Sequence, residues 1–115
     1  MNVPGGQYIN AIMQNAATGT GNGTAMDCTA ATRGAMTVLT MQVAGTFSAT
    51  ITWEATIDGT NWVAVQATNL ETGVIATTAT AADIYRITVL GLVSVRARIS
   101  AYTSGTITIT GILTS

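Results

Sequence analysis

Few residues of this 115-residue chain could perform acid–base or nucleophilic chemistry. The sequence contains no histidine, so the usual serine and cysteine triads would lack their base. It contains no lysine either, which removes Schiff-base chemistry and Ser–Lys dyads. Glu54 and Asp58 are the one close pair of carboxylates that could in principle hydrolyse a glycosidic bond. Because the turn that follows Asp58 explains that residue better, we predict no catalytic residues and no enzyme.

Two loops have the composition of ligand sites. Residues 58–61 (Asp-Gly-Thr-Asn) offer oxygen atoms, but Ca²⁺ takes about six to eight oxygen ligands and the five acidic residues are spread along the chain. The glycine-rich residues 19–23 superficially resemble a phosphate-binding loop, yet such loops open a helix and strand-like sequence follows here. Cys28 is alone, so no cysteine cluster or internal disulfide can form. We therefore expect no metal and no cofactor.

Tryptophan and tyrosine side chains raise glycan binding as an alternative function. Trp53 shares a face with apolar residues and is expected in the core, whereas Trp62, next to a turn, fits either the core or a binding surface. Tyr102 shares an alternating face with Arg96 and Arg98, and these three are candidate partner-binding residues. The competing interpretation of the trio is a solvated sheet face with cation–π contacts.

Alternation with period two predicts the strands that would position these residues, since successive strand side chains point to opposite faces. The clearest example is 46–57, in which one face is apolar and the other is rich in threonine. The Asp58-Gly59 turn and a return strand over 62–67 complete a predicted hairpin. Further strands are predicted at 33–43, 83–90, 93–102 and 106–113, with a turn at 103–105. Short strands between turns favour an all-β domain, an antiparallel β-sandwich or a jelly-roll-like fold. The apolar face of 46–57 comprises Phe47, Ala49, Ile51, Trp53, Ala55 and Ile57.

The first thirty residues differ from the rest. An apolar patch lies between the turn-like Pro4-Gly5-Gly6 and the glycine-rich residues 18–23. Such a patch is typical of an arm that becomes ordered on a partner, and it could equally be the first strand of the sandwich. We therefore divide the chain into residues 1–30, an N-terminal arm or first strand, and a β-sandwich domain over 31–115. The candidate partner-binding residues in the patch are Tyr8, Ile9, Ile12 and Met13.

Charge is scarce in this sequence. Charged residues make up 8% of the chain, against about 25% in an average globular protein. The net charge of −1 provides no field that would attract nucleic acid or an anionic membrane. No apolar run approaches the roughly 18 to 20 residues of a membrane helix, and we find no signal-peptide pattern at the start. So few charges fit either a surface coated with threonine or, as we favour, a surface that is partly covered in a larger assembly.

Two stretches resemble a pattern that is common in small structural proteins of tailed phages. They are residues 45–62, which contain Trp53-Glu-Ala-Thr-Ile-Asp-Gly-Thr-Asn-Trp62, and residues 85–111, which contain Ser94-Val-Arg-Ala-Arg-Ile-Ser-Ala-Tyr102. The resemblance covers somewhat under half of the chain. It implies a virion β-sandwich, including capsid decoration (cement) proteins and tail or appendage proteins, and it transfers no catalytic residues.

The expected function is a non-enzymatic capsid decoration protein that binds and stabilises the phage head. The expected partners are the major capsid protein and further copies of the chain, as a homotrimer of the kind that such decoration proteins often form. Neither nucleic acid nor membrane is expected as a partner. The protein would be made in the host cytoplasm and end on the capsid surface. The alternatives are a tail, fibre or baseplate component and a glycan-binding module.

Overall fold

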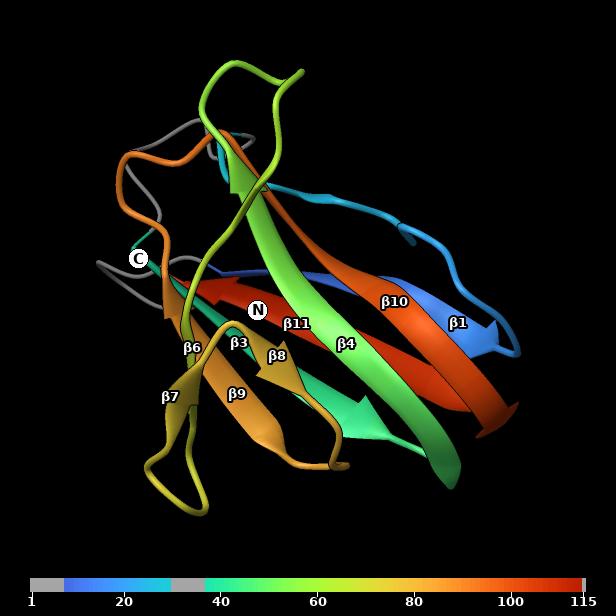
Figure 1. Cartoon of the computed structure of the whole chain (residues 1–115). Helices are drawn as coiled ribbons and strands as arrows, with labels where there is room; N and C mark the ends of the chain where they lie inside the picture. The colour runs from blue at the N-terminus through green and yellow to red at the C-terminus, as the bar shows by residue number, and fades with distance from the viewer. Residues whose placement is uncertain (1–7, 30–36, 115) are drawn as a thin grey trace.

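Two antiparallel sheets form the domain in the computed structural model, which describes residues 8–29 and 37–114 (Figure 1). One sheet has the order β1-β11-β3-β9-β6-β7, and the other has the order β2-β10-β4-β5 with β8 also paired to β4. The predicted antiparallel β-sandwich is confirmed. The described strands are β1 (Tyr8–Ala17), β2 (Met26–Asp27), β3 (Val38–Ala44), β4 (Phe47–Thr56), β5 (Val63–Ala64), β6 (Ala67–Asn69), β7 (Ile75–Ala76), β8 (Thr78–Ala79), β9 (Ile84–Thr88), β10 (Ser94–Gly105) and β11 (Ile107–Thr114).

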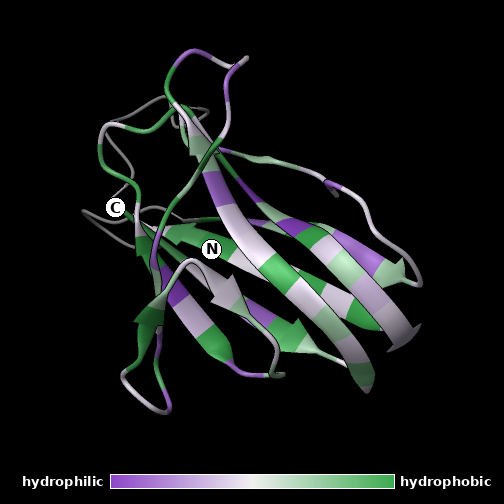
Figure 2. Cartoon of the chain, in the orientation of Figure 1, coloured by the Kyte–Doolittle hydropathy of each residue, from purple (hydrophilic) through white to green (hydrophobic). Residues whose placement is uncertain are grey.

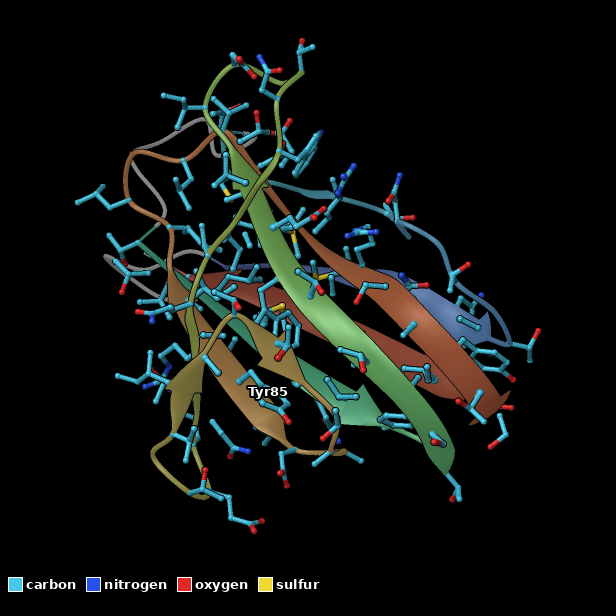
Figure 3. The ribbon with its side chains drawn as sticks, viewed as in Figure 1. Tyr85 is labelled. Atoms are coloured by element: carbon cyan, nitrogen blue, oxygen red, sulfur yellow. The ribbon has the colours of Figure 1, made fainter. Side chains whose placement is uncertain are left out.

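The core lies between the two sheets and is built by alternating residues. Along the first half of β10, every second side chain is buried while its neighbours are partly exposed, and Figure 2 shows the same alternation of hydropathy along β4 and β10. Trp53 on β4 is fully buried, and its ring centroid lies 5.0 Å from that of Tyr85 on β9, which Figure 3 labels. Aromatic pairs at this separation add to the stability gained from burial alone. Other fully buried large side chains are Met13, Leu39, Met41, Ile51, Ile99, Ile107, Ile109 and Leu113.

Two of the corners at which the chain passes from one sheet to the other pack against each other. One corner joins β3 to β4 through Gly45 and Thr46, and the other joins β10 to β11 through Gly105 and Thr106. The backbone N–H of Thr106 donates to the carbonyl oxygen of Thr46 at 3.1 Å. The predicted turn at 103–105 is therefore wrong in position, because β10 continues to Gly105 before the chain changes sheet.

The predicted hairpin after β4 forms, but its return strand is much shorter than expected. Only Val63 and Ala64 pair with β4, and the chain then crosses to the other sheet, where Ala67–Asn69 forms β6. Ile57, expected in the core, is 72% exposed because β4 ends at Thr56 and the turn begins there.

A bulge in β10 reverses the faces of its second half. Ile99 pairs with Ile51 whereas Ala101 pairs with Thr50, so Ser100 is an extra residue on β10. Ala101, predicted to face inward, is consequently exposed. Among the other predicted strands, 33–43 is observed as β3 from Val38 onward, with 33–36 outside the described residues. The predicted strand 83–90 contains β9, and 106–113 covers β11 except for its last residue, Thr114.

Residues 8–17 form β1, which pairs with β11 at the edge of the six-stranded sheet. The two interpretations of the N-terminal region were an arm or a first strand. Residues 1–7 and 30 of that region lie outside the described residues. Beyond β1 the chain crosses to the edge of the other sheet, where Gly21 exchanges two backbone hydrogen bonds with Ile99 and β2 pairs with the start of β10. The region between β1 and β2 thus links the edges of both sheets.

The buried side chain of Gln14 connects the edges of the two sheets by hydrogen bonds. Its side chain is 6% exposed and follows Met13, the extra residue of a bulge in β1. The amide Nε2 donates to the carbonyl oxygen of Ala97 at 2.8 Å and to that of Gly21 at 3.2 Å. This one side chain therefore ties β1 to β10 and to the connecting segment.

Replacing Gln14 by methionine keeps the volume of the side chain but removes both hydrogen bonds. We expect the free energy of unfolding to fall by about 2 kcal/mol, since each buried bond contributes roughly 1 kcal/mol. Gln42→Met is the matched control on the exposed face of β3, with an expected change within about 0.5 kcal/mol. Urea unfolding followed by circular dichroism measures both, and equal losses would contradict the assigned role of Gln14.

Candidate functional site

An ionic cluster occupies the outer face of the five-stranded sheet. Glu54 on β4 lies directly opposite Arg96 on β10, and Arg98 lies opposite the neighbouring Thr52. The Nε of Arg96 donates to Oε1 of Glu54 at 2.8 Å, and the Nε of Arg98 donates to Oε2 at 3.2 Å. The cluster consists of these two arginines and Glu54, whose side chain is only 11% exposed.

Trp62 covers one end of this ionic cluster. Its ring lies 4.2 Å from the guanidinium carbon of Arg96, within cation–π range. The side chain of Trp62 is partly buried. It is therefore neither a fully buried core residue nor a fully open platform for a sugar ring, the two positions that the sequence allowed.

Tyr102 does not share the face of Arg96 and Arg98 as predicted. The bulge at Ser100 turns its ring toward the core, against which it packs while partly buried. Its hydroxyl donates to the carbonyl oxygen of Gly105 at 2.6 Å. The candidate trio is therefore reduced to the two arginines, joined by Glu54.

The described side chains of the N-terminal candidates lie on both faces of β1. Met13 is 1% exposed and belongs to the core, so it is not available to a partner in this structure. Ile9 packs against the core while partly buried, whereas Ile12 is 52% exposed. The backbone of Tyr8 pairs with Thr114. The side chains of Ile9, Ile12 and Met13 thus do not form one exposed apolar patch.

An apolar hollow of about 300 Å³ lies where the turn after β4 meets residues 89–93. Ile57 and Val63, at its rim, are 72% and 65% exposed. Val65 and Leu92 also line it, together with Ala55. This surface was not predicted from the sequence, because the alternation in 46–57 places Ile57 on the core face of the strand.

The carboxylate of Asp58 is fully used by its own turn. It accepts hydrogen bonds from the backbone N–H groups of Thr60 and Asn61 at 2.8 Å each, from the Asn61 side chain and from the Thr56 hydroxyl. These donors, above all Asn61, hold the pKa of Asp58 well below its usual range. Residues 58–61 thus form a turn closed by its own hydrogen bonds.

The depressed pKa of Asp58 predicts a pH dependence of stability. The ionised carboxylate stabilises the fold above the pKa of the unfolded chain, near 4, and this contribution is lost as the pH falls below that value. Asp58→Asn should lower the melting temperature at pH 7, and the difference from the original protein should shrink between pH 4 and pH 2. Melting curves across this range test it; a constant difference would contradict the assignment.

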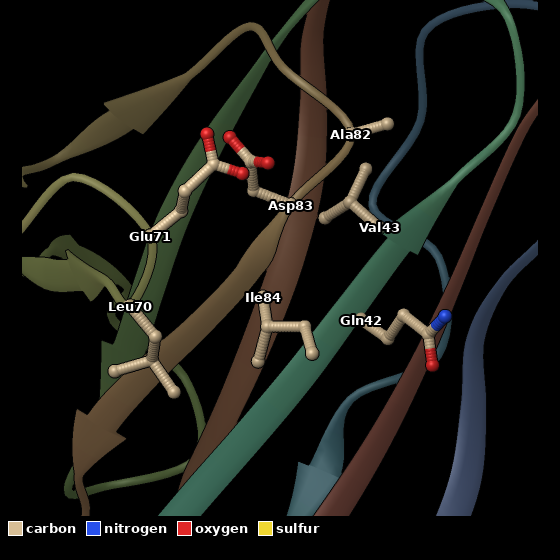
Figure 4. Close-up of a pocket in the computed structure, with 7 residues that line it drawn as sticks. All are labelled: Gln42, Val43, Leu70, Glu71, Ala82, Asp83 and Ile84. Carbon is tan, nitrogen blue, oxygen red and sulfur yellow. The ribbon is translucent and has the colours of Figure 1, made fainter.

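A second hollow, of about 400 Å³, lies beside β9 and the turn after β6 (Figure 4). Leu70 and Ile84 line its apolar side, and the carboxylates of Glu71 and Asp83 point toward each other above them. The Asn69 side chain donates to Asp83 at 3.0 Å. Within the described residues, no group of three or more potential ligands that could hold a metal ion is found.

The carboxylates and the thiol that were considered for catalysis are engaged or buried in the described structure. Glu54, one half of the hypothetical glycosidase pair, is engaged by two arginines, and Asp58, the other half, is engaged by its turn. Burial raises the pKa of the lone Cys28 thiol to about 11, so it is a poor nucleophile. The described residues include no helix of the length and hydropathy required to cross a bilayer.

Comparisons with known proteins place this fold among prophage proteins. A family model described as XepA matches residues 7–113. The crystal structure of the SPBc2 prophage-derived protein YomS is similar with a TM-score of 0.84 and 19% identity, covering 100% of this chain and 97% of that one. The crystal structure of the PBSX exported protein XepA is similar with a TM-score of 0.88 and 14% identity, covering 100% of this chain but 40% of that one. No curated protein matches in sequence.

Proposed function

The chain belongs to the XepA family, and from this premise we propose that it is a phage-associated, non-enzymatic structural protein that docks on the phage head as an oligomer. Of its structural neighbours, one is described as a prophage-derived protein and the other as an exported protein. At these low sequence identities the structural neighbours support the fold alone, and the association of this chain with a phage is proposed.

The observation that carries the docking role is the apolar hollow at the end of the sandwich. Ile57 and Val63 expose more than half of their surfaces there, beside the partly buried Val65 and Leu92. Exposed apolar side chains that gather at one place mark interaction surfaces in soluble proteins. The low content of charged residues supports the same role, because little charge opposes the burial of this surface in an assembly.

The capsid as the partner, and the trimer as the oligomer, are inferred from the resemblance to phage decoration proteins. We propose that the apolar hollow contacts the coat protein and that further copies of the chain associate around the same site on the head. Neither contact requires nucleic acid or a membrane.

Ile57→Asp tests the docking surface. Purified phage heads that lack the protein are mixed with the variant and sedimented, and bound protein is quantified. We expect at least a tenfold loss of affinity, because a charge would be buried without a partner. Ile75→Asp is the matched control, since Ile75 is 58% exposed on β7 of the other sheet and should bind normally. Unchanged binding of Ile57→Asp would contradict the proposal.

A second candidate function is favoured by the match to the PBSX exported protein XepA. In that case the protein would act outside the cytoplasm and not on the particle. The two are separated by fractionating a phage-producing culture before lysis: protein free in the medium supports export, whereas protein that sediments with particles inside the cells supports docking. A tail location would be recognised by labelling the protein on particles for electron microscopy.

A further inference from the structure

The arginines of the ionic cluster retain unused hydrogen-bond donors. Each guanidinium bonds Glu54 through its Nε. In the part of the chain that the structure describes, no hydrogen bond or ion pair engages the terminal Nη atoms of Arg96 or Arg98. A guanidinium has five N–H donors, so each arginine keeps its terminal fork for a ligand.

The charge of the cluster selects the kind of anion. Two arginines and one glutamate leave a net charge of +1, which suits a monoanion. A dianionic phosphate would meet the Glu54 carboxylate, which is already 2.8 Å from the Nε of Arg96, and the two negative groups would repel each other. The planar fork of a guanidinium also matches the two oxygens of a carboxylate.

The cluster is held in place before any ligand arrives. Glu54 is almost completely buried and fixes both arginines, and Trp62 lies against the Arg96 guanidinium at 4.2 Å. The side chain of Arg96 is 18% exposed and that of Arg98 is 38% exposed, so Arg98 is the more accessible. Side chains ordered in advance lose less entropy on binding.

The surroundings indicate that the carboxylate belongs to a polypeptide. Thr52 and Ser100 lie beside Arg98 on the same face, and their hydroxyls are 2.7 Å apart. This face of the sheet therefore offers hydroxyl groups beside the two guanidiniums. A hydroxyl-bearing sheet face of this kind fits a partner chain that presents one acidic side chain.

We infer that Arg96 and Arg98 form a binding site for an aspartate or glutamate side chain of a protein partner. Glu54 and Trp62 act as positioning residues that hold the two guanidiniums. The chemistry of the site stands on the geometry of the cluster, and only the identification of the partner as the surface of the phage head rests on the proposed function.

The test uses the full chain and a capped peptide, Thr-Gly-Thr-Glu-Thr-Gly-Thr, in which glutamate is the only charge. Side-chain Nε–H signals of Arg96 and Arg98 are followed by NMR as the peptide is added. We expect saturable shifts at both arginines, no shifts with the peptide that carries Gln in place of Glu, and weaker binding of inorganic phosphate. Equal shifts with the Gln peptide, or tighter binding of phosphate, would overturn the inference.

Arg98→Gln and Arg86→Gln form a matched pair of variants. Arg86 is an exposed arginine on β9 of the other sheet, and no hydrogen bond or ion pair of its side chain is found among the described residues. Arg98→Gln should weaken binding of the Glu peptide at least fivefold, whereas Arg86→Gln should leave it unchanged. Equal weakening by the two variants would mean that the peptide responds to overall charge, which overturns the site.

The same variants separate this inference from the proposed function. If Arg98→Gln loses both the peptide and the phage head, both are supported. If it loses the peptide but binds heads normally, the carboxylate site is supported and its assignment to the head is overturned. If it loses heads but not the peptide, the carboxylate site is overturned, while docking on the head is supported.

Discussion

Replacing Trp53 by alanine should lower the free energy of unfolding by about 3–5 kcal/mol, the largest loss that we expect from any single truncation in the core. Trp53 is fully buried between the sheets, and its ring contacts that of Tyr85 at 5.0 Å with an angle of 47° between the planes. Alanine would remove this contact and leave a cavity that the surrounding strands can fill only in part. Urea unfolding followed by far-ultraviolet circular dichroism measures the change.

Trp62→Ala is the control for the Trp53 prediction. Trp62 is the same residue type, but it is partly exposed and packs on Arg96 at the surface. We expect its truncation to cost about 1 kcal/mol, which is the scale of an exposed cation–π contact. Equal losses for the two variants would contradict the assignment of Trp53 to the core and of Trp62 to the outer face.

Gly105→Ala should cost about 3–4 kcal/mol because it disturbs the corner where β10 gives way to β11. The φ of Gly105 is 96°, a conformation that costs other residues roughly 1–2 kcal/mol. A Cβ atom there would also lie 2.1 Å from the carbonyl oxygen of Thr46 and 2.5 Å from the Cα of Phe47. Relieving this overlap requires the two packed corners to separate, at a further cost of about 2 kcal/mol.

Gly91→Ala separates the two contributions to the Gly105 effect. The φ of Gly91 is 91°, close to that of Gly105, but a Cβ atom at Gly91 would meet nothing within 4 Å. We therefore expect a loss of about 1–2 kcal/mol for Gly91→Ala. If both variants lose the same free energy of unfolding in urea, the close packing of the two corners contributes nothing to stability.

The strands were predictable because alternation is a local property. Val95, Ala97 and Ile99 alternate with polar residues, and all three are buried on β10 as predicted. The reversal beyond Ser100 was not predictable, because the residue that bulges depends on pairing with β4, which is distant in the sequence. The same limit applies to Gln14, because the bulge in β1 turns it inward directly after Met13, which is itself buried by the alternation of Ile9 and Ala11.

The candidate site was predictable only in part. Period two placed Arg96 and Arg98 on one outer face, and the structure agrees. Their common partner Glu54 lies more than forty residues earlier, and only the register between β4 and β10 brings it between them. The apolar hollow could not be predicted for a related reason, since nothing in the alternation indicates that β4 stops at Thr56 and leaves Ile57 exposed.

We propose that the protein acts by docking on the phage head, and a count of its copies on purified heads distinguishes docking from release. Heads separated from tails on a density gradient are analysed by quantitative mass spectrometry against the major capsid protein. We predict a fixed ratio of this chain to the capsid protein that persists after a second gradient. Heads that carry no copies, with the protein recovered from the culture medium instead, would contradict docking on the phage head.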